Sequence, residues 1–250
     1  MTRATRLAAT LAVPAIFGIC GPAWSNTIVI DDFDTGSLNV SIPDGAAGPN
    51  SGGVACAGCV GGARHVSVAR TNATDDAIAL EVNPAGFAAG WFLYSNEFGV
   101  DSQAIVLWDG GTDATNDHGL ALDLTGAGGG IAVELESDIA VSYTFTVFSN
   151  SGARSSTASL SLSSALGDGD LTNGGVLSIL TAASFVGDVD FSNIQSIVMT
   201  IDGNPSFDTA IRFVEYRLPE PGALAMLGLG LLGVAGFSRN RRRLTKAVSG

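Results

Sequence analysis

The stretch VSYTFTVFSNSG, residues 141–152, decides the fold class of this 250-residue chain. Its first seven positions alternate apolar residues with serine and threonine, which is the period of a β-strand with one buried face. The SNSG that follows has the composition of a tight turn. Similar short runs recur from residue 26 to residue 217 between turn sequences such as PDG, NPAG, DGG and DGNP; they include TIVIDDF, ARHVSVAR, AIALEV, QAIVLW, IAVELE, SIVMTI and AIRFVEY. No amphipathic helix of useful length separates these runs, so the pattern predicts an all-β domain, a jelly roll or β-sandwich of two sheets.

The two ends of the chain differ from this middle region. Residues 1–25 begin with two arginines, continue with the apolar run LAATLAVPAIFGICGPA and end in small residues, an order typical of a secretory signal peptide. We expect cleavage after Ser25, because a lipoprotein signal needs a small residue before Cys20 and this sequence has Ile19 there. The predicted parts are a signal peptide over 1–25, a β-sandwich domain over 26–217 and a sorting segment over 218–250.

The charge of the middle region excludes nucleic acid as its partner. Residues 26–218 contain 23 acidic residues against five arginines and no lysine, which gives a formal net charge of −18. Binding to a polyanion depends on cations that neutralise its phosphates. Divalent cations and neutral sugars remain as possible ligands.

The mature protein keeps two cysteines, Cys56 and Cys59, in the sequence CAGC, because Cys20 leaves with the signal peptide. A closed zinc site would need a second pair or histidines at zinc spacing, and the sequence has neither. In an exported protein this spacing favours a small-loop disulfide. A redox pair is the alternative, although no helix begins beside it to activate a thiol.

The C-terminal segment reads LPEPGALAMLGLGLLGVAGFSRNRRR over residues 218–243. Residues 222–238 form an uncharged run of 17 residues, at the short end of what crosses a bilayer as a helix. A membrane-stop cluster of cations follows directly: Arg239, Arg241, Arg242 and Arg243. The positive-inside rule places this cluster in the cytoplasm and the acidic domain outside. A buried core helix is the alternative, and the adjacent cations disfavour it.

Pro219, Glu220 and Pro221, followed by a glycine-rich apolar run and an arginine cluster, resemble the PEP-CTERM sorting signal of exported proteins in Gram-negative bacteria that make exopolysaccharide. The resemblance implies cleavage near these three residues by a membrane protease, an exosortase, after a transient stay in the inner membrane. It also implies delivery to the cell surface or beyond. LPEPG resembles the LPxTG signal of Gram-positive sortase substrates as well. Pro221 stands where that family has the attacked threonine, so this interpretation ranks second.

The middle region resembles secreted jelly-roll domains of the carbohydrate-binding or galactose-binding type. The residues that carry this resemblance are DDFD at 31–34, GGAR at 61–64, WDG at 108–110 and the closing runs at 191–203 and 208–216. The resemblance implies calcium held near the first and last strands by Asp32, Asp34 and Glu215. Two turns, DATNDHG at 113–119 and DGDLTNG at 168–174, partly imitate calcium loops but lack the glycine and glutamate of an EF-hand. Solvated carboxylates are the alternative at each place.

No catalytic motif surrounds His65 or His118, so the sequence predicts that the protein is not an enzyme. Trp91, Tyr94 and Trp108 are candidates for stacking on sugars, and burial in the core is favoured for each. We therefore expect an exported cell-surface or matrix protein, structural, adhesive or associated with a glycan of an exopolysaccharide matrix. The alternative class is a secreted polysaccharide hydrolase, because 23 acidic residues leave room for a catalytic carboxylate pair.

Overall fold

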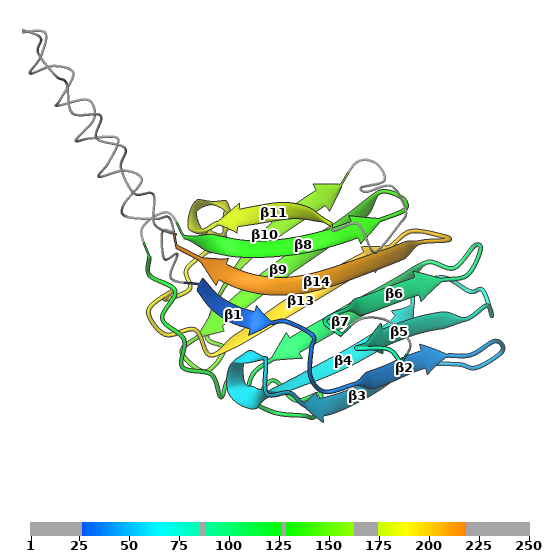
Figure 1. The fold of residues 1–250 in the computed structure, drawn as a ribbon, viewed down its shortest axis with the longest axis horizontal. Helices are drawn as coiled ribbons and strands as arrows, with labels where there is room; N and C mark the ends of the chain where they lie inside the picture. Colours follow the sequence, from blue (N-terminus) through cyan, green and yellow to red (C-terminus); the bar gives the residue numbers. More distant parts are fainter. Residues whose placement is uncertain (1–26, 86–88, 127–128, 163–174, 219–250) are drawn as a thin grey trace, which may run out of the picture. The chain divides into compact units, whose positions relative to one another are not determined.

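The structure, a computed structural model, describes residues 27–85, 89–126, 129–162 and 175–218. These residues form two packed antiparallel sheets, which confirms the predicted all-β sandwich of jelly-roll type (Figure 1). The predicted signal peptide, the apolar run of the sorting segment and the turn at 168–174 lie outside the described residues. Within the described residues, no helix is long and apolar enough to cross a membrane.

Sheet A has seven strands in the order β11-β8-β14-β6-β5-β2, with β1 also paired to β14. Its strands are β1 (Thr27–Asp31), β2 (Leu38–Ile42), β5 (Ile78–Val82), β6 (Phe92–Asn96), β8 (Gly130–Ser137), β11 (Val176–Thr181) and β14 (Asp208–Arg217). The first and last described strands therefore lie side by side at the centre of one sheet.

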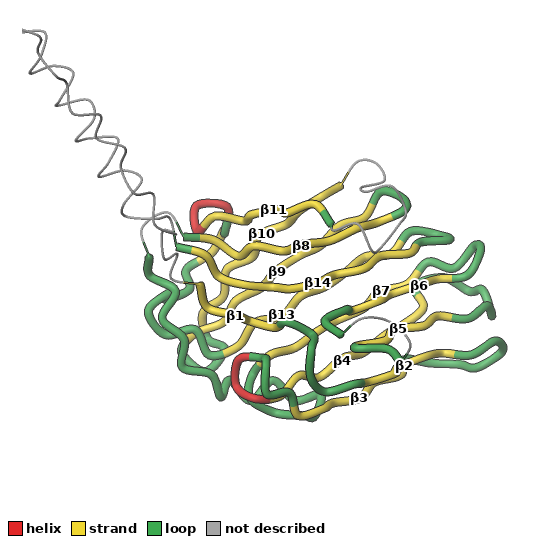
Figure 2. The backbone as a smooth tube through the Cα atoms, in the orientation of Figure 1, coloured by secondary structure: helices red, strands yellow, loops and turns green. Residues whose placement is uncertain are grey.

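Sheet B also has seven strands, in the order β12-β10-β9-β13-β7-β4-β3. Its strands are β3 (Asn50–Ala55), β4 (Ala63–Arg70), β7 (Ser102–Trp108), β9 (Val141–Ser149), β10 (Arg154–Leu162), β12 (Val186–Gly187) and β13 (Ser196–Gly203). Two single helical turns, Val60–Gly62 and Ala182–Ser184, interrupt the described strands and loops (Figure 2).

The core lies between the two sheets and follows from the alternation in the sequence. In β9, the apolar side chains at 141, 143, 145 and 147 are buried, while the serine and threonines between them are half-buried on the opposite face. Aromatic rings fill much of the interior: Phe33 lies 5.5 Å from Phe92, and Tyr94 lies 5.6 Å from Phe207. Each such side chain contributes about 1.5–3 kcal/mol by burial.

The same alternation gives sheet B a polar outer face. On β9 and β10 this face carries rows of hydroxyl groups, in which Thr144 bonds Ser159 at 3.1 Å and Thr146 bonds Thr157 at 3.2 Å. The rows continue onto β13, where Thr200 lies opposite Thr144. A loop between β7 and β8 borders this face at its other side, beside β3 and β4.

Candidate functional site: a groove on the outer face of sheet B

A groove of ≈430 Å³ opens on the outer face of sheet B. It is lined by Pro49, Ser51, His65, Ser67, Ile105, Leu107, Ala114, Asn116 and Val198. The lining combines three branched apolar side chains with hydroxyl, imidazole and amide groups, and it contains no carboxylate, lysine or arginine. A concave surface of this composition suits an uncharged ligand that has both apolar and hydroxyl faces.

The strand register creates the floor of the groove. His65 on β4 lies opposite Leu107 on β7, and Ser67 lies opposite Ile105. Val198 on β13 lies opposite Leu107 from the other side. Because directly opposed residues of neighbouring strands share one face, three strands place these side chains together although they are far apart in sequence.

One wall of the groove is the loop over residues 109–119, and Asp109 holds this loop closed. The Asp109 side chain is fully buried. Its Oδ1 accepts the Gly111 N–H at 2.8 Å and its Oδ2 accepts the Asp117 N–H at 2.7 Å. Its carbonyl oxygen accepts the Gly119 N–H at 2.9 Å. The WDG motif thus marks the base of a loop whose two ends are joined through a single aspartate.

The loop rests on β3 at a position where only glycine fits. A Cβ at Gly53 would lie 1.6 Å from the Thr112 carbonyl oxygen. Asn116, on the same loop, lines the groove, and its Oδ1 is buried without a hydrogen-bond partner among the described residues. A buried acceptor without a partner costs about 1–3 kcal/mol, so a hydroxyl of a ligand or solvent would stabilise this wall.

His65 is the titratable group of the groove lining. Its side chain is buried, and this burial lowers its pKa from the ordinary value of 6.5, while the charges of Asp113 and Asp109 act more weakly in the opposite direction. The imidazole is therefore neutral at pH 7 and offers one donor and one acceptor.

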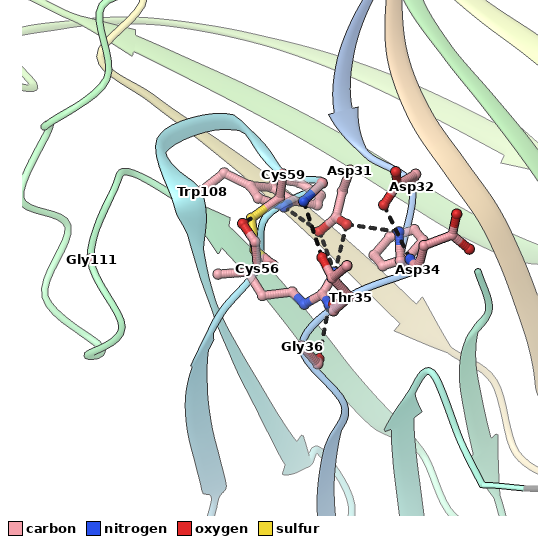
Figure 3. The surroundings of a disulfide bond; sticks show 12 residues. Asp31, Asp32, Asp34, Thr35, Gly36, Cys56, Cys59, Trp108 and Gly111 are labelled. Atoms are coloured by element: carbon pink, nitrogen blue, oxygen red, sulfur yellow. Dashed lines mark hydrogen bonds and ion pairs between the residues drawn. A yellow bond between two sulfur atoms is a disulfide. The ribbon is translucent and has the colours of Figure 1, made fainter. Parts of the chain in front are cut away.

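A second polar cluster lies beneath this face and holds the sandwich together (Figure 3). The fully buried Arg64 donates from Nη1 to both carboxylate oxygens of Asp31 at 2.6 Å, and from Nη2 to the carbonyl oxygens of Thr35 and Gly36. Trp108 Nε1 donates to Asp31 Oδ2 at 2.8 Å. Burial raises the pKa of Asp31, and Arg64 and Trp108 oppose this shift. The cluster joins β1, β4 and β7, which makes it a structural element.

Cys56 and Cys59 form a disulfide with a Cα–Cα distance of 5.5 Å, as the CAGC spacing predicted (Figure 3). Within the described residues, Asp31 and the two cysteines are the group of three possible metal ligands whose atoms lie within 4.8 Å of one another. This group does not fit a metal ion. Its sulfurs are bonded to each other, and the carboxylate of Asp31 is already paired with Arg64.

The predicted calcium ligands occupy two places. Asp32 and Asp34 lie in the loop after β1, where the Asp34 N–H donates to Asp32 Oδ1 at 3.1 Å. A Cβ at Gly90 would lie 2.5 Å from Asp34 Oδ1 and 3.2 Å from the Asp32 carbonyl oxygen, so these two oxygens face a common point. Glu215 lies on β14, and its Oε1 accepts from Arg217 Nη2 at 3.0 Å. Calcium binding by the three residues stays a prediction.

The structure places the remaining sequence candidates as follows. Trp91, Tyr94 and Trp108 are 8%, 1% and 0% exposed, so all three belong to the interior, as favoured. In the loop at 113–119, Asp113 Oδ1 accepts the Thr115 N–H at 2.9 Å, a local turn contact. The groove itself was not predicted. Alternation alone could have indicated which residues point outward, but not which strands are neighbours.

The model of the PEP-CTERM protein-sorting motif matches residues 218–243, which confirms the sorting signal expected from the sequence. This motif indicates export across the inner membrane to the cell surface or the extracellular space. The match includes Pro219, Glu220, Pro221 and the arginine cluster that follows the apolar run. The roles of these individual residues stay predictions.

Comparison with curated proteins found no match. A solved structure similar to the domain is a family 11 carbohydrate-binding module from Clostridium thermocellum in complex with a β-1,3-1,4-mixed-linked tetrasaccharide, with 12% identity over 77% of this chain and 95% of that chain and a TM-score of 0.38. Another is a family 61 carbohydrate-binding module in complex with β-1,4-galactotriose, with 8% identity over 60% and 86% of the two chains and a TM-score of 0.33. An agarase matches over 61% of this chain and 22% of its own, with 9% identity and a TM-score of 0.34.

Proposed function

We propose that the protein is a non-enzymatic component of an extracellular matrix and that its sandwich domain binds a neutral polysaccharide in the groove of sheet B. The observation that carries the proposal is the groove lining, which joins uncharged hydrogen-bonding groups to apolar side chains on an exported domain. A sugar ring presents C–H faces and hydroxyl edges. Ile105, Leu107 and Val198 would contact the C–H faces, while Ser67 and Asn116 would bond hydroxyls.

Charge supports a neutral ligand over an anionic one. The domain has a net charge of −18, and Asp109 and Asp113 lie close enough to His65 to influence its pKa. Desolvating an anionic sugar beside these carboxylates, without a cation in the lining, would be unfavourable. Burial of a sugar hydroxyl group carries no such desolvation cost when the hydroxyl forms a hydrogen bond in the groove.

The lining also favours binding over hydrolysis, the alternative function. Glycosidases use two carboxyl groups that flank the bond to be broken. None of the residues that line the groove has a carboxyl group. We therefore expect retention of the glycan without turnover.

In the proposed processing pathway, an exosortase cleaves near Pro219, Glu220 and Pro221 while the apolar run lies in the inner membrane. The freed domain then takes a structural or adhesive place in the matrix. Calcium belongs to the same proposal, because Asp32 and Asp34 offer the oxygen ligands that this ion prefers. Glu215 would have to leave Arg217 to join them.

Affinity electrophoresis of the mature protein tests the groove. The gels contain mixed-linkage β-1,3-1,4-glucan or β-1,4-galactan as neutral probes, or alginate as an anionic one. We expect a neutral probe to retard the protein, and Ser67→Trp to weaken this at least about tenfold by filling the groove floor. Ser142→Trp is the matched control, because Ser142 is equally half-buried on the same face of sheet B, outside the groove. Retardation by alginate alone, or equal retardation of the Ser67→Trp variant, contradicts the proposal.

A further inference from the structure

Exposed apolar side chains gather on one short segment of the described chain. Six large apolar residues of the described part are exposed, and four of them lie between residues 176 and 186. They are Val176, Leu177, Ile179 and Val186, with 41%, 42%, 51% and 81% of their surfaces exposed. Three of these four belong to a single strand, β11.

Among the strands that the structure describes, β11 is the end strand of sheet A and pairs with β8 alone. Natural sheets protect such edges with lysine, proline, bulges or very short strands. The segment GVLSILTAASFVG, residues 175–187, contains no charged residue and no proline. The strand pairs with β8 over its whole length, Val176 to Thr181, without a register shift. As far as the described residues go, β11 is thus a regular strand edge without the usual protection.

Two ion pairs lie on sheet A beside β11, in a domain whose net charge is −18. On β8, next to β11, the carboxylate of Glu134 lies 3.5 Å from the guanidinium of Arg212. On β14, Glu215 is paired with Arg217, whose guanidinium also lies 5.4 Å from the ring centre of Phe213. Two of the five arginines of residues 26–218 therefore neutralise acids at this one corner of sheet A.

We propose that β11 pairs with β11 of a second copy of this chain, so that sheet A continues across a two-fold axis. An antiparallel pair of identical edge strands satisfies two-fold symmetry, and each strand completes the hydrogen bonds of the other. Two strongly acidic molecules repel each other over most of their surfaces. Around β11, two arginines offset the charges of Glu134 and Glu215, so the repulsion between two copies is reduced there, and this charge pattern favours a second copy as the occupant.

The dimer would also bring two grooves together. This consequence rests on the proposed function of the groove, whereas the pairing of β11 strands is independent of it. A two-fold axis that joins antiparallel edge strands is perpendicular to the common sheet. Both copies of sheet B then lie on the same side of the joined sheet, and their two grooves face the same polymer. Bivalent attachment of this kind raises apparent affinity by about 10²–10⁴ when the spacing permits it.

Sedimentation of the mature full-length protein recovered from the producing cells tests the pairing. We expect a dimer at about 10 µM, and Ile179→Glu to weaken the dimer at least about 100-fold by placing a carboxylate of each copy at the shared edge. Phe98→Glu is the control, because Phe98 is 88% exposed and lies outside sheet A, between β6 and β7. It should leave the dimer intact.

Two results would overturn the dimer. One is a wild-type protein that stays monomeric at about 100 µM, and the other is an Ile179→Glu variant that dimerises as well as the wild type. A third possibility is that another segment of the same chain covers the β11 edge. Hydrogen exchange of the β11 amides tests this, because the amides would then stay protected when the protein is diluted to monomer. That result would also contradict the proposal. A dimer that binds no glycan would refute the proposed function and leave the pairing standing.

Discussion

Replacing Asp31 with alanine should destabilise the domain more than any exposed substitution. The change removes the carboxylate that accepts from Arg64 Nη1 at 2.6 Å, from Trp108 Nε1 at 2.8 Å and from the Phe33 N–H at 2.9 Å. Arg64 is fully buried, so its charge would remain in the interior without a counter-charge. Breaking a buried ion pair in this way costs about 3–5 kcal/mol.

Urea denaturation followed by tryptophan fluorescence measures this cost, with Tm as a second reading. For a domain of this size, about 2–4 °C of Tm is lost per kcal/mol, so Asp31→Ala should lower Tm by about 6–20 °C. Asp202→Ala is the control, because Asp202 is an exposed carboxylate that accepts one bond from Gln103 at 2.8 Å. It should cost less than about 1 kcal/mol.

A double variant separates the ion pair from packing. Asp31→Leu combined with Arg64→Met removes both charges and leaves no unpaired ion in the core, so it should be more stable than Asp31→Ala alone. A cost of Asp31→Ala below about 1 kcal/mol would refute the structural role of this cluster.

Three further predictions concern the groove and the loop after β1. Gly53→Ala should displace the loop wall, because its Cβ would lie 1.6 Å from the Thr112 carbonyl oxygen; glycan binding should fall while the far-UV spectrum stays unchanged, and undiminished binding would show that the loop is not a wall of the site. Burial lowers the pKa of His65 below its unfolded value of 6.5, so the unfolded state binds more protons and stability falls as pH drops below about 6.5. His65→Gln should flatten that part of the Tm–pH curve, and an unaltered slope contradicts the assignment. Millimolar calcium should raise Tm in the wild type, by an amount that corresponds to about 2.7 kcal/mol at 100 times Kd, and not in Asp34→Asn; an equal rise in both rules out this ligand.

The fold class could be predicted because the burial pattern of each strand is local. The alternation in VSYTFTVF corresponds residue by residue to the buried and outward positions of β9. The CAGC disulfide was equally local, since three positions separate its cysteines. Such short-range patterns can be interpreted from the sequence without knowing which strands become neighbours.

The groove could not be predicted because it depends on strand order. Ser51 and Val198 line the same groove although they are far apart in sequence, and only the pairing of β3, β4, β7 and β13 brings them together. The burial of Arg64 could not be predicted either, because it also depends on a contact between residues distant in sequence. Nothing local to ARHVSVAR indicates that its first arginine is buried, because the partner that permits burial is Asp31, 33 positions earlier.

The loop at 109–119 shows a role of aspartate that composition does not separate from metal binding. Within it, the turn at 113–119 partly imitates a calcium loop, because it carries oxygen-bearing side chains at alternate positions. In the structure, Asp113 Oδ1 accepts the Thr115 N–H, and the two carboxylate oxygens of Asp109 accept the N–H groups of Gly111 and Asp117. An aspartate in a turn can accept hydrogen bonds from backbone N–H groups or bind a metal ion, and the sequence does not distinguish these two roles.

The intact mass of the protein recovered from culture medium and from cell surfaces tests most directly whether this chain is an exported matrix protein. We predict loss of the first 25 residues together with everything beyond the Pro-Glu-Pro sequence at 219–221. A mass that retains the arginine cluster after residue 238 would mean a permanent membrane anchor and would contradict processing at the sorting motif.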